Sequence, residues 1–88
     1  MRGWKMDHSL QAQELRIENY LRKHGSITTP EARHQLDIVM PAPRIHTLRH
    51  KRGLNITTIM VKDRNPGGSV HRFARYVLQK GKYQGGKQ

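Results

Sequence analysis

The 88-residue sequence has no cysteine, only six acidic residues and no long apolar run. The absence of cysteine excludes disulfide bonds and zinc sites built on thiolates. No segment has the length and hydrophobicity of a secretory signal core or a transmembrane helix, so we expect the protein to stay where it is made. Leu, Ile, Val and Phe make up only about a fifth of the chain, near the lower limit for a folded domain. These shortages predict a single domain with a small core.

Basic residues, by contrast, are abundant. Seventeen Lys and Arg residues oppose six Asp and Glu, which gives a formal net charge of +11 and a pI near 11.0. A domain this basic is typical of proteins that bind a polyanion, and nucleic acid is the first candidate. An anionic membrane is the second, but no amphipathic helix sets a basic face against one rich in Trp, Phe and Leu. We therefore expect a nucleic-acid partner and no membrane partner.

Capping residues and apolar spacing predict two helices in the first half of the chain. The first helix begins after Ser9, a good N-cap, and Gly25 ends it. The run Thr-Pro-Glu at 29–31 then combines an N-cap in Thr29, a proline for the first turn and an acid. These residues predict the start of a second helix. Between the two helices, residues 25–28 are enough for no more than a strand stub.

The stretch 40–53 predicts a third helix, around which the rest of the chain is organised. Its prolines are tolerated in a first helical turn, and Gly53 supplies a C-terminal stop. Pro41, Ile45 and Leu48 form a thin apolar seam. The remaining surface carries nitrogen donors and one hydroxyl: Arg44, His46, Thr47, His50 and Lys51. Such a face suits phosphates and base edges better than an apolar protein surface.

After the third helix the pattern becomes that of a β-hairpin. Residues 55–61 are rich in β-branched side chains and predict one strand, and residues 70–78 predict a second with Ala74, Tyr76 and Leu78 on one face. Turn-forming residues fill positions 63–69 between them. The hairpin is basic near its tip.

The predicted domain therefore spans residues 9–79. It is preceded by a flexible leader at 1–8 and followed by a disordered basic tail at 80–88, which is mostly Gly, Lys and Gln.

Helix, strand stub, helix, turn, helix and hairpin is the element order of the winged helix-turn-helix, an α+β fold with three helices and a C-terminal two-stranded β-hairpin wing. Three runs, at 21–28 (LRKHGSIT), 44–56 (RIHTLRHKRGLNI) and 72–78 (RFARYVL), resemble the small helix-turn-helix proteins of bacteriophages and prophages. The resemblance covers about residues 12 to 78, and the prolines within 40–43 depart from it. It implies a small transcriptional regulator in the cytoplasm of a bacterial host cell, associated with the nucleoid.

We therefore expect the chain to bind double-stranded DNA, with its third helix in the major groove. The expected base contacts are Arg44, His46, Thr47, His50 and Lys51. Arg44 is the strongest candidate among them, because arginine can hold guanine through two hydrogen bonds. The expected backbone contacts are basic residues of the second helix, the third helix and the hairpin: Arg33, His34, Arg52, Lys62, Arg64 and Arg72.

Other functions fit the sequence less well. His46 and His50 have the spacing of two zinc ligands, but the glutamate of an HExxH helix is absent and Arg49 lies between them. No nucleophile–base order, phosphate-binding glycine loop or acidic cluster indicates an enzyme, so we expect no catalysis, metal or cofactor. Structured RNA is disfavoured because the strands lack exposed aromatic pairs. The alternative from another class is a protein-interaction module, such as a phage inhibitor that binds an acidic surface of a host protein.

Overall fold

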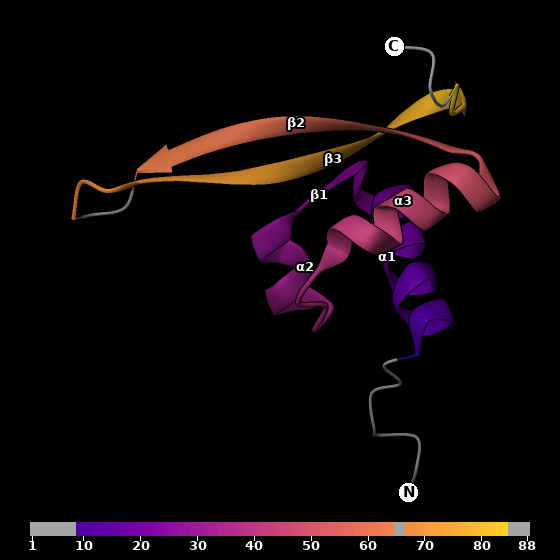
Figure 1. The fold of residues 1–88 in the computed structure, drawn as a ribbon, viewed down its shortest axis with the longest axis horizontal. Coiled ribbons are helices and arrows are strands. Elements are labelled where there is room, and N and C mark those ends of the chain that lie inside the picture. Colours follow the sequence, from indigo (N-terminus) through magenta and orange to yellow (C-terminus); the bar gives the residue numbers. More distant parts are fainter. Residues whose placement is uncertain (1–8, 65–66, 85–88) are drawn as a thin grey trace, which may run out of the picture.

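The computed structural model describes residues 9–64 and 67–84 (Figure 1). The element order is the predicted one: α1 (Leu10–His24), β1 (Ser26–Thr28), α2 (Thr29–Gln35), α3 (Pro41–Arg52), β2 (Leu54–Arg64) and β3 (Val70–Lys82). The predicted leader at 1–8 and the last four residues of the predicted tail lie outside the described residues.

The ends of α1 and α3 are set by the residues that the sequence indicates. The hydroxyl of Ser9 accepts a hydrogen bond from the Ala12 backbone N–H at 3.1 Å and so caps α1. Gly25 and Gly53 follow α1 and α3 in the left-handed conformation, with φ of 88° and 72°. Glycine adopts this conformation without the steric penalty that a Cβ brings. The first and third helices therefore end where predicted.

The N-cap of α2 is Thr28, so the prediction of Thr29 as the cap is wrong by one residue. The Thr28 hydroxyl accepts from the Glu31 N–H at 3.1 Å, and the Glu31 carboxylate accepts from the Thr28 N–H at 2.9 Å. This reciprocal pair is a capping box, which requires the two side chains to be three residues apart. Only Thr28 has that spacing from Glu31, and Thr29 becomes the first residue of the helix.

The turn between α2 and α3 is held by one buried side chain. Ile38 is 1% exposed, and its N–H donates to the Ala32 carbonyl at 3.0 Å. Asp37, just before it, has a positive φ of 57°, a conformation that Asp tolerates better than most residues. The apolar corner thus fixes the direction in which α3 leaves the turn.

The three strands form one antiparallel sheet in the order β1-β3-β2. The α+β class is confirmed, but a two-stranded sheet is not what forms. The strand stub pairs with β3 through Ile27 opposite Tyr76, and both side chains are buried. A two-stranded hairpin is marginally stable alone, and the third strand anchors its base to the helices. Beyond β1, the β2–β3 ribbon extends past the helices as the wing (Figure 1).

Both hairpin strands are longer than predicted. Asp63 and Arg64, expected in the turn, pair with residues of β3, and at the other end Lys82 pairs with Leu54. Residues 80–82 of the predicted tail are therefore part of β3. These end residues have low strand propensity, but propensity depends on context. They join the strands because the neighbouring strand offers their backbone groups hydrogen bonds.

The core lies between the helices and one face of the sheet. Its buried apolar residues come from every element: Ile17, Leu21, Ile27, Ala32, Ile38, Ile45, Leu48, Leu54, Ile56 and Tyr76. The predicted seam of α3 is confirmed, because Pro41, Ile45 and Leu48 are all buried. Ala74 and Leu78 pack at the edge of this core on the same face as Tyr76, as predicted. Within the described residues, no helix has the length and apolar character needed to cross a membrane.

Candidate nucleic-acid interface

The side of α3 opposite the core presents the polar groups that the sequence indicates. His46 and His50 are exposed and lie one turn apart, with ring centroids 4.3 Å from each other. Thr47 lies beside them, and its hydroxyl donates to the Pro43 carbonyl at 3.2 Å. This hydrogen bond leaves the hydroxyl oxygen able to accept one from a ligand. The exposed face thus offers two imidazoles and one hydroxyl to a partner.

Arg44 and Lys51 lie on one flank of this face. Lys51 is exposed and Arg44 is half-buried. The Nε atom of Arg44 is buried and has no hydrogen-bond partner among the described residues. A buried donor without an acceptor is costly, but this atom has no surface open to a ligand, so only the rest of the Arg44 side chain is available to a partner.

Three of the predicted backbone contacts gather on one face of the wing. Lys62 is paired with Arg72 across the ladder, and Arg64 is paired with Val70. Directly opposed residues share a face, and alternate residues along a strand return to it. Every second residue of β3 after Arg72 returns to this face, and at the base of the sheet the second of them, Tyr76, is buried under the helices. The three cations therefore share one face of the β2–β3 ribbon beyond the helices, and all three are exposed.

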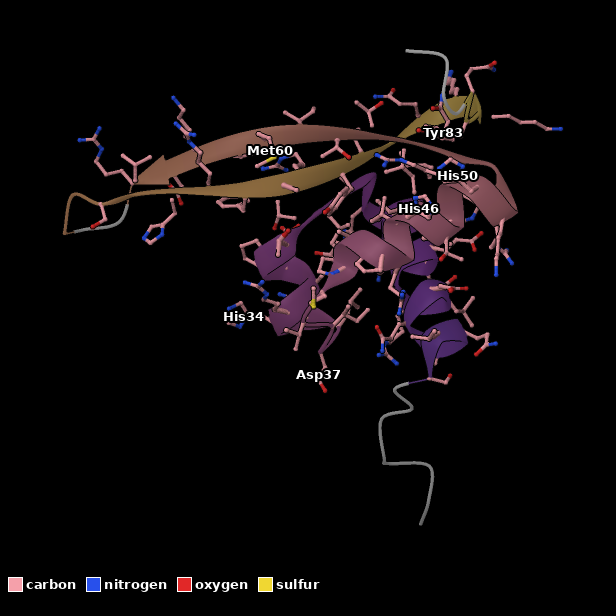
Figure 2. The ribbon with its side chains drawn as sticks, viewed as in Figure 1. His34, Asp37, His46, His50, Met60 and Tyr83 are labelled. Carbon is pink, nitrogen blue, oxygen red and sulfur yellow. The ribbon has the colours of Figure 1, made fainter. Side chains whose placement is uncertain are left out.

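Two other predicted backbone contacts have intramolecular partners. The Nε atom of Arg52 lies 2.9 Å from a carboxylate oxygen of Glu18 on α1. The Nε–H of Arg33 donates to the Val39 carbonyl at 2.9 Å and so closes the turn after α2. His34, also on α2, is exposed at a distance from the α3 histidines (Figure 2). The predicted contact residues thus fall into two sets. Those on the exposed face of α3 and on the wing are available to a partner, whereas Arg33 and Arg52 also stabilise the fold.

Glu18 is the buried anchor for two of the basic residues. Its side chain is 7% exposed, and Arg22, one turn later on α1, lies 2.8 Å from it. Burial acts to raise the pKa of Glu18, but the hydrogen bonds and positive charges of Arg22 and Arg52 outweigh it and hold the pKa below its usual value. The carboxylate is therefore a structural ion-pair partner that ties α1 to the end of α3.

Two residues that the sequence reasoning did not assign also belong to this region. Arg49 lies on the flank of α3 that faces β2, and Tyr83 follows β3 in the segment predicted to be disordered. The Tyr83 ring meets the His50 ring edge-on, with centroids 5.3 Å apart (Figure 2). An aromatic residue among Gly, Lys and Gln is atypical of a disordered tail. The presence of Tyr83 was therefore the one sequence feature that could have indicated an ordered segment here.

The histidine pair does not form a metal site with other described residues. Within 9–64 and 67–84, no group of three or more His, Asp or Glu side chains is placed to hold a metal ion. The described side chains at α3 and the wing offer hydrogen-bond donors, hydrogen-bond acceptors and positive charge.

Comparison with known families gives one match. The model of a family described as a winged helix-turn-helix domain matches residues 12–81, from the first turn of α1 almost to the end of β3. No curated protein and no solved structure matches the chain.

Proposed function

The chain belongs to the winged helix-turn-helix domain family, and from this premise we propose that it binds duplex DNA with α3 in the major groove and the wing on the flanking backbone. Membership confirms the family resemblance carried by the sequence motifs and supports a DNA-binding role in general. It also favours a binding module over an enzyme. The groove, the contacting residues and the regulatory role are our proposals.

The observation that carries the proposal is the placement of the wing cations. Lys62, Arg64 and Arg72 are exposed together on one face of the ribbon that extends beyond the helices. A duplex that meets α3 and lies along this ribbon would contact the wing cations at the same time. Phosphate contacts of this kind set the register of a protein on DNA without reading its sequence. The wing would thus supply affinity and orientation.

Base reading would then fall to α3. An imidazole ring presents two nitrogen atoms that can hydrogen-bond to base edges, so His46 and His50 suit the major groove. Thr47 adds a hydroxyl and a methyl group. On the flank, Arg44 would hold guanine and Lys51 a neighbouring base or phosphate. Occupation of an operator or promoter by this surface would make the protein a small regulator of the phage type.

Selection of bound fragments from random duplex DNA tests the proposal. We expect an enriched sequence, and we expect Lys62→Ala to lower affinity severalfold for all duplexes. Lys23→Ala on α1 is the matched control, because it removes an equal charge from an exposed site that belongs to neither α3 nor the wing. Equal losses from both variants would contradict the assigned surface. Absence of duplex binding, with a protein partner retained after nuclease treatment, would overturn the proposed function.

A further inference from the structure

The C-terminal end of α3 is covered by the residue that follows the last strand. The backbone N–H of Tyr83 donates to the Gly53 carbonyl at 3.0 Å, which fixes Tyr83 beside the end of the helix. Its ring contacts His50 edge-on at an interplanar angle of 87°. The guanidinium carbon of Arg49 lies 5.4 Å from the centroid of the same ring, within the range of a cation–π contact. One aromatic side chain thus touches two residues of α3.

Arg49 is held from its other side by β2. Its Nε–H donates to the Ile56 carbonyl at 2.8 Å, and Nη2 donates to the Thr58 hydroxyl at 2.6 Å. The third nitrogen, Nη1, makes no hydrogen bond to any residue that the structure describes. Because its position is fixed in advance, this guanidinium loses little side-chain entropy when it binds a ligand.

The fixed guanidinium borders a pocket between α3 and the edge of β2. The pocket has a volume of about 320 Å³. Its lining residues are one aliphatic residue, one aromatic residue and five polar ones, with no acidic side chain: Arg49, Asn55, Ile56, Thr57, Thr58, Tyr83 and Gln84. A cation with hydroxyl and amide groups around it is suited to an oxyanion rather than to an apolar group.

We propose that this pocket binds one phosphate of the DNA backbone, with Arg49 as the ligand and Tyr83 as its positioning residue. The proposal rests on the proposed function and adds a contact that the sequence did not assign. The pocket adjoins His50, so the strand that flanks a groove-docked α3 passes beside it. Nη1 of Arg49 would donate to a phosphate oxygen, and the Thr58 hydroxyl, which accepts from Nη2 of Arg49, would donate to the same phosphate. Tyr83 would act only by holding Arg49 and the end of α3 in place.

The test compares three variants on a duplex of about 20 base pairs, roughly two helical turns. Arg49→Gln should lower affinity about tenfold, the scale of one charged hydrogen bond, and by the same factor for every sequence. Loss of one phosphate contact should also make the slope of log K against log salt shallower by about 0.9. Tyr83→Ala should reproduce part of both changes. Tyr83→Phe is the control, because it keeps the ring contacts and removes only the hydroxyl.

Thermal melts of each variant show whether a loss of affinity comes from a loss of folded protein. Because Tyr83 acts through Arg49, the double variant Arg49→Gln/Tyr83→Ala should bind no more weakly than Arg49→Gln alone. The Arg49 Nε–H NMR signal should shift when the duplex is added. Inorganic phosphate at matched ionic strength should shift it far less; an equal shift would assign the pocket to free phosphate and overturn the proposal. A folded Arg49→Gln protein with wild-type affinity and salt slope would overturn it too, and would leave the proposed function standing. Failure of the wild-type protein to bind any duplex would instead remove the proposed function itself.

Discussion

Glu18 shows how a single residue serves both the fold and the charge balance of the molecule. Its carboxylate is almost fully buried, while Arg22 and Arg52 remain more than half exposed. Burial alone raises the pKa of Glu18, and the two guanidinium groups reverse this effect, so the net pKa is lowered. The folded protein therefore keeps this group ionised at a pH where the unfolded chain begins to bind a proton.

This sign predicts an acid-sensitive contribution to stability. A lowered pKa in the folded state means that the contribution is fully present above the unfolded pKa, about 4.3 for glutamate. It is lost as the pH falls through the folded value. Chemical denaturation at a series of pH values between about 7 and 3 should show the free energy of unfolding falling with pH. In Glu18→Gln this pH dependence should be smaller. At neutral pH the variant should be less stable by about 1–3 kcal/mol.

Glu14→Gln is the matched control, because Glu14 lies one turn earlier on α1 and forms no ion pair with a described residue. It should leave both the stability and its pH dependence nearly unchanged. If Glu18→Gln lost stability at low pH as much as the wild-type protein does, the ion pairs with Arg22 and Arg52 would contribute nothing to stability.

Individual residues also show which features could be predicted from the sequence and which could not. Composition and helical spacing correctly identified α3 as the polar helix, since its seam of Ile45 and Leu48 is a local pattern. The partners of its cations are not local. Arg52 meets Glu18 from 34 positions away in the chain, and Tyr83 reaches Gly53 across the sheet. Side-chain partners at such separations follow from packing, which single-sequence patterns do not contain.

At the scale of elements, α2 is the shortest helix and depends most on its cap. The capping box joins Thr28 to Glu31 through two hydrogen bonds. Thr28→Ala removes one of them and should cost about 1–2 kcal/mol. Thr29→Ala is the matched control: the same change at the first helical position should alter stability by no more than about 0.5 kcal/mol. Thermal melts of both variants test whether Thr28 or Thr29 is the N-cap of α2. A larger loss of stability in Thr29→Ala than in Thr28→Ala would favour Thr29, the cap expected from the sequence.

In α3, stability and binding should separate by face. Leu48 is fully buried, so Leu48→Ala should cost about 2–4 kcal/mol, a large part of the stability of so small a domain. His46 is exposed, and His46→Ala should change the melting temperature little while lowering affinity for the selected duplex by about 1–3 kcal/mol. Melts and titrations on the same two proteins check this. Full-strength, sequence-specific binding by His46→Ala would remove His46 from the base contacts.

Strands were the elements whose extent the sequence predicted least well. Helix ends carry local signals such as Ser9, Gly25 and Gly53, and these were accurate for α1 and α3. Strand ends depend on whether a neighbouring strand continues to offer hydrogen bonds. Lys80 and Lys82 therefore extend β3 against β2 although their composition is that of a tail, and the pairing of β1 with β3 turned a predicted two-stranded wing into a three-stranded sheet.

For the molecule as a whole, the wing should add affinity without choosing sequence. Arg64 is exposed near the tip, on the face of the wing that also carries Lys62 and Arg72. Backbone contacts carry no direct sequence information, so Arg64→Ala should weaken binding to selected and unrelated duplexes by similar factors. Competition titrations against both duplexes measure this. A changed sequence preference, with affinity for unrelated DNA intact, would make the wing a reader of bases.

Binding of duplex DNA through both α3 and the wing, by a chain of net charge +11, requires that several backbone phosphates be neutralised. The most direct test is the salt dependence of binding to the selected duplex. Neutralising about five to eight phosphates should give a slope of log K against log salt of roughly −4 to −7. A slope shallower than about −2 would mean that no more than about two phosphates are neutralised, which would contradict simultaneous docking of the helix and the wing.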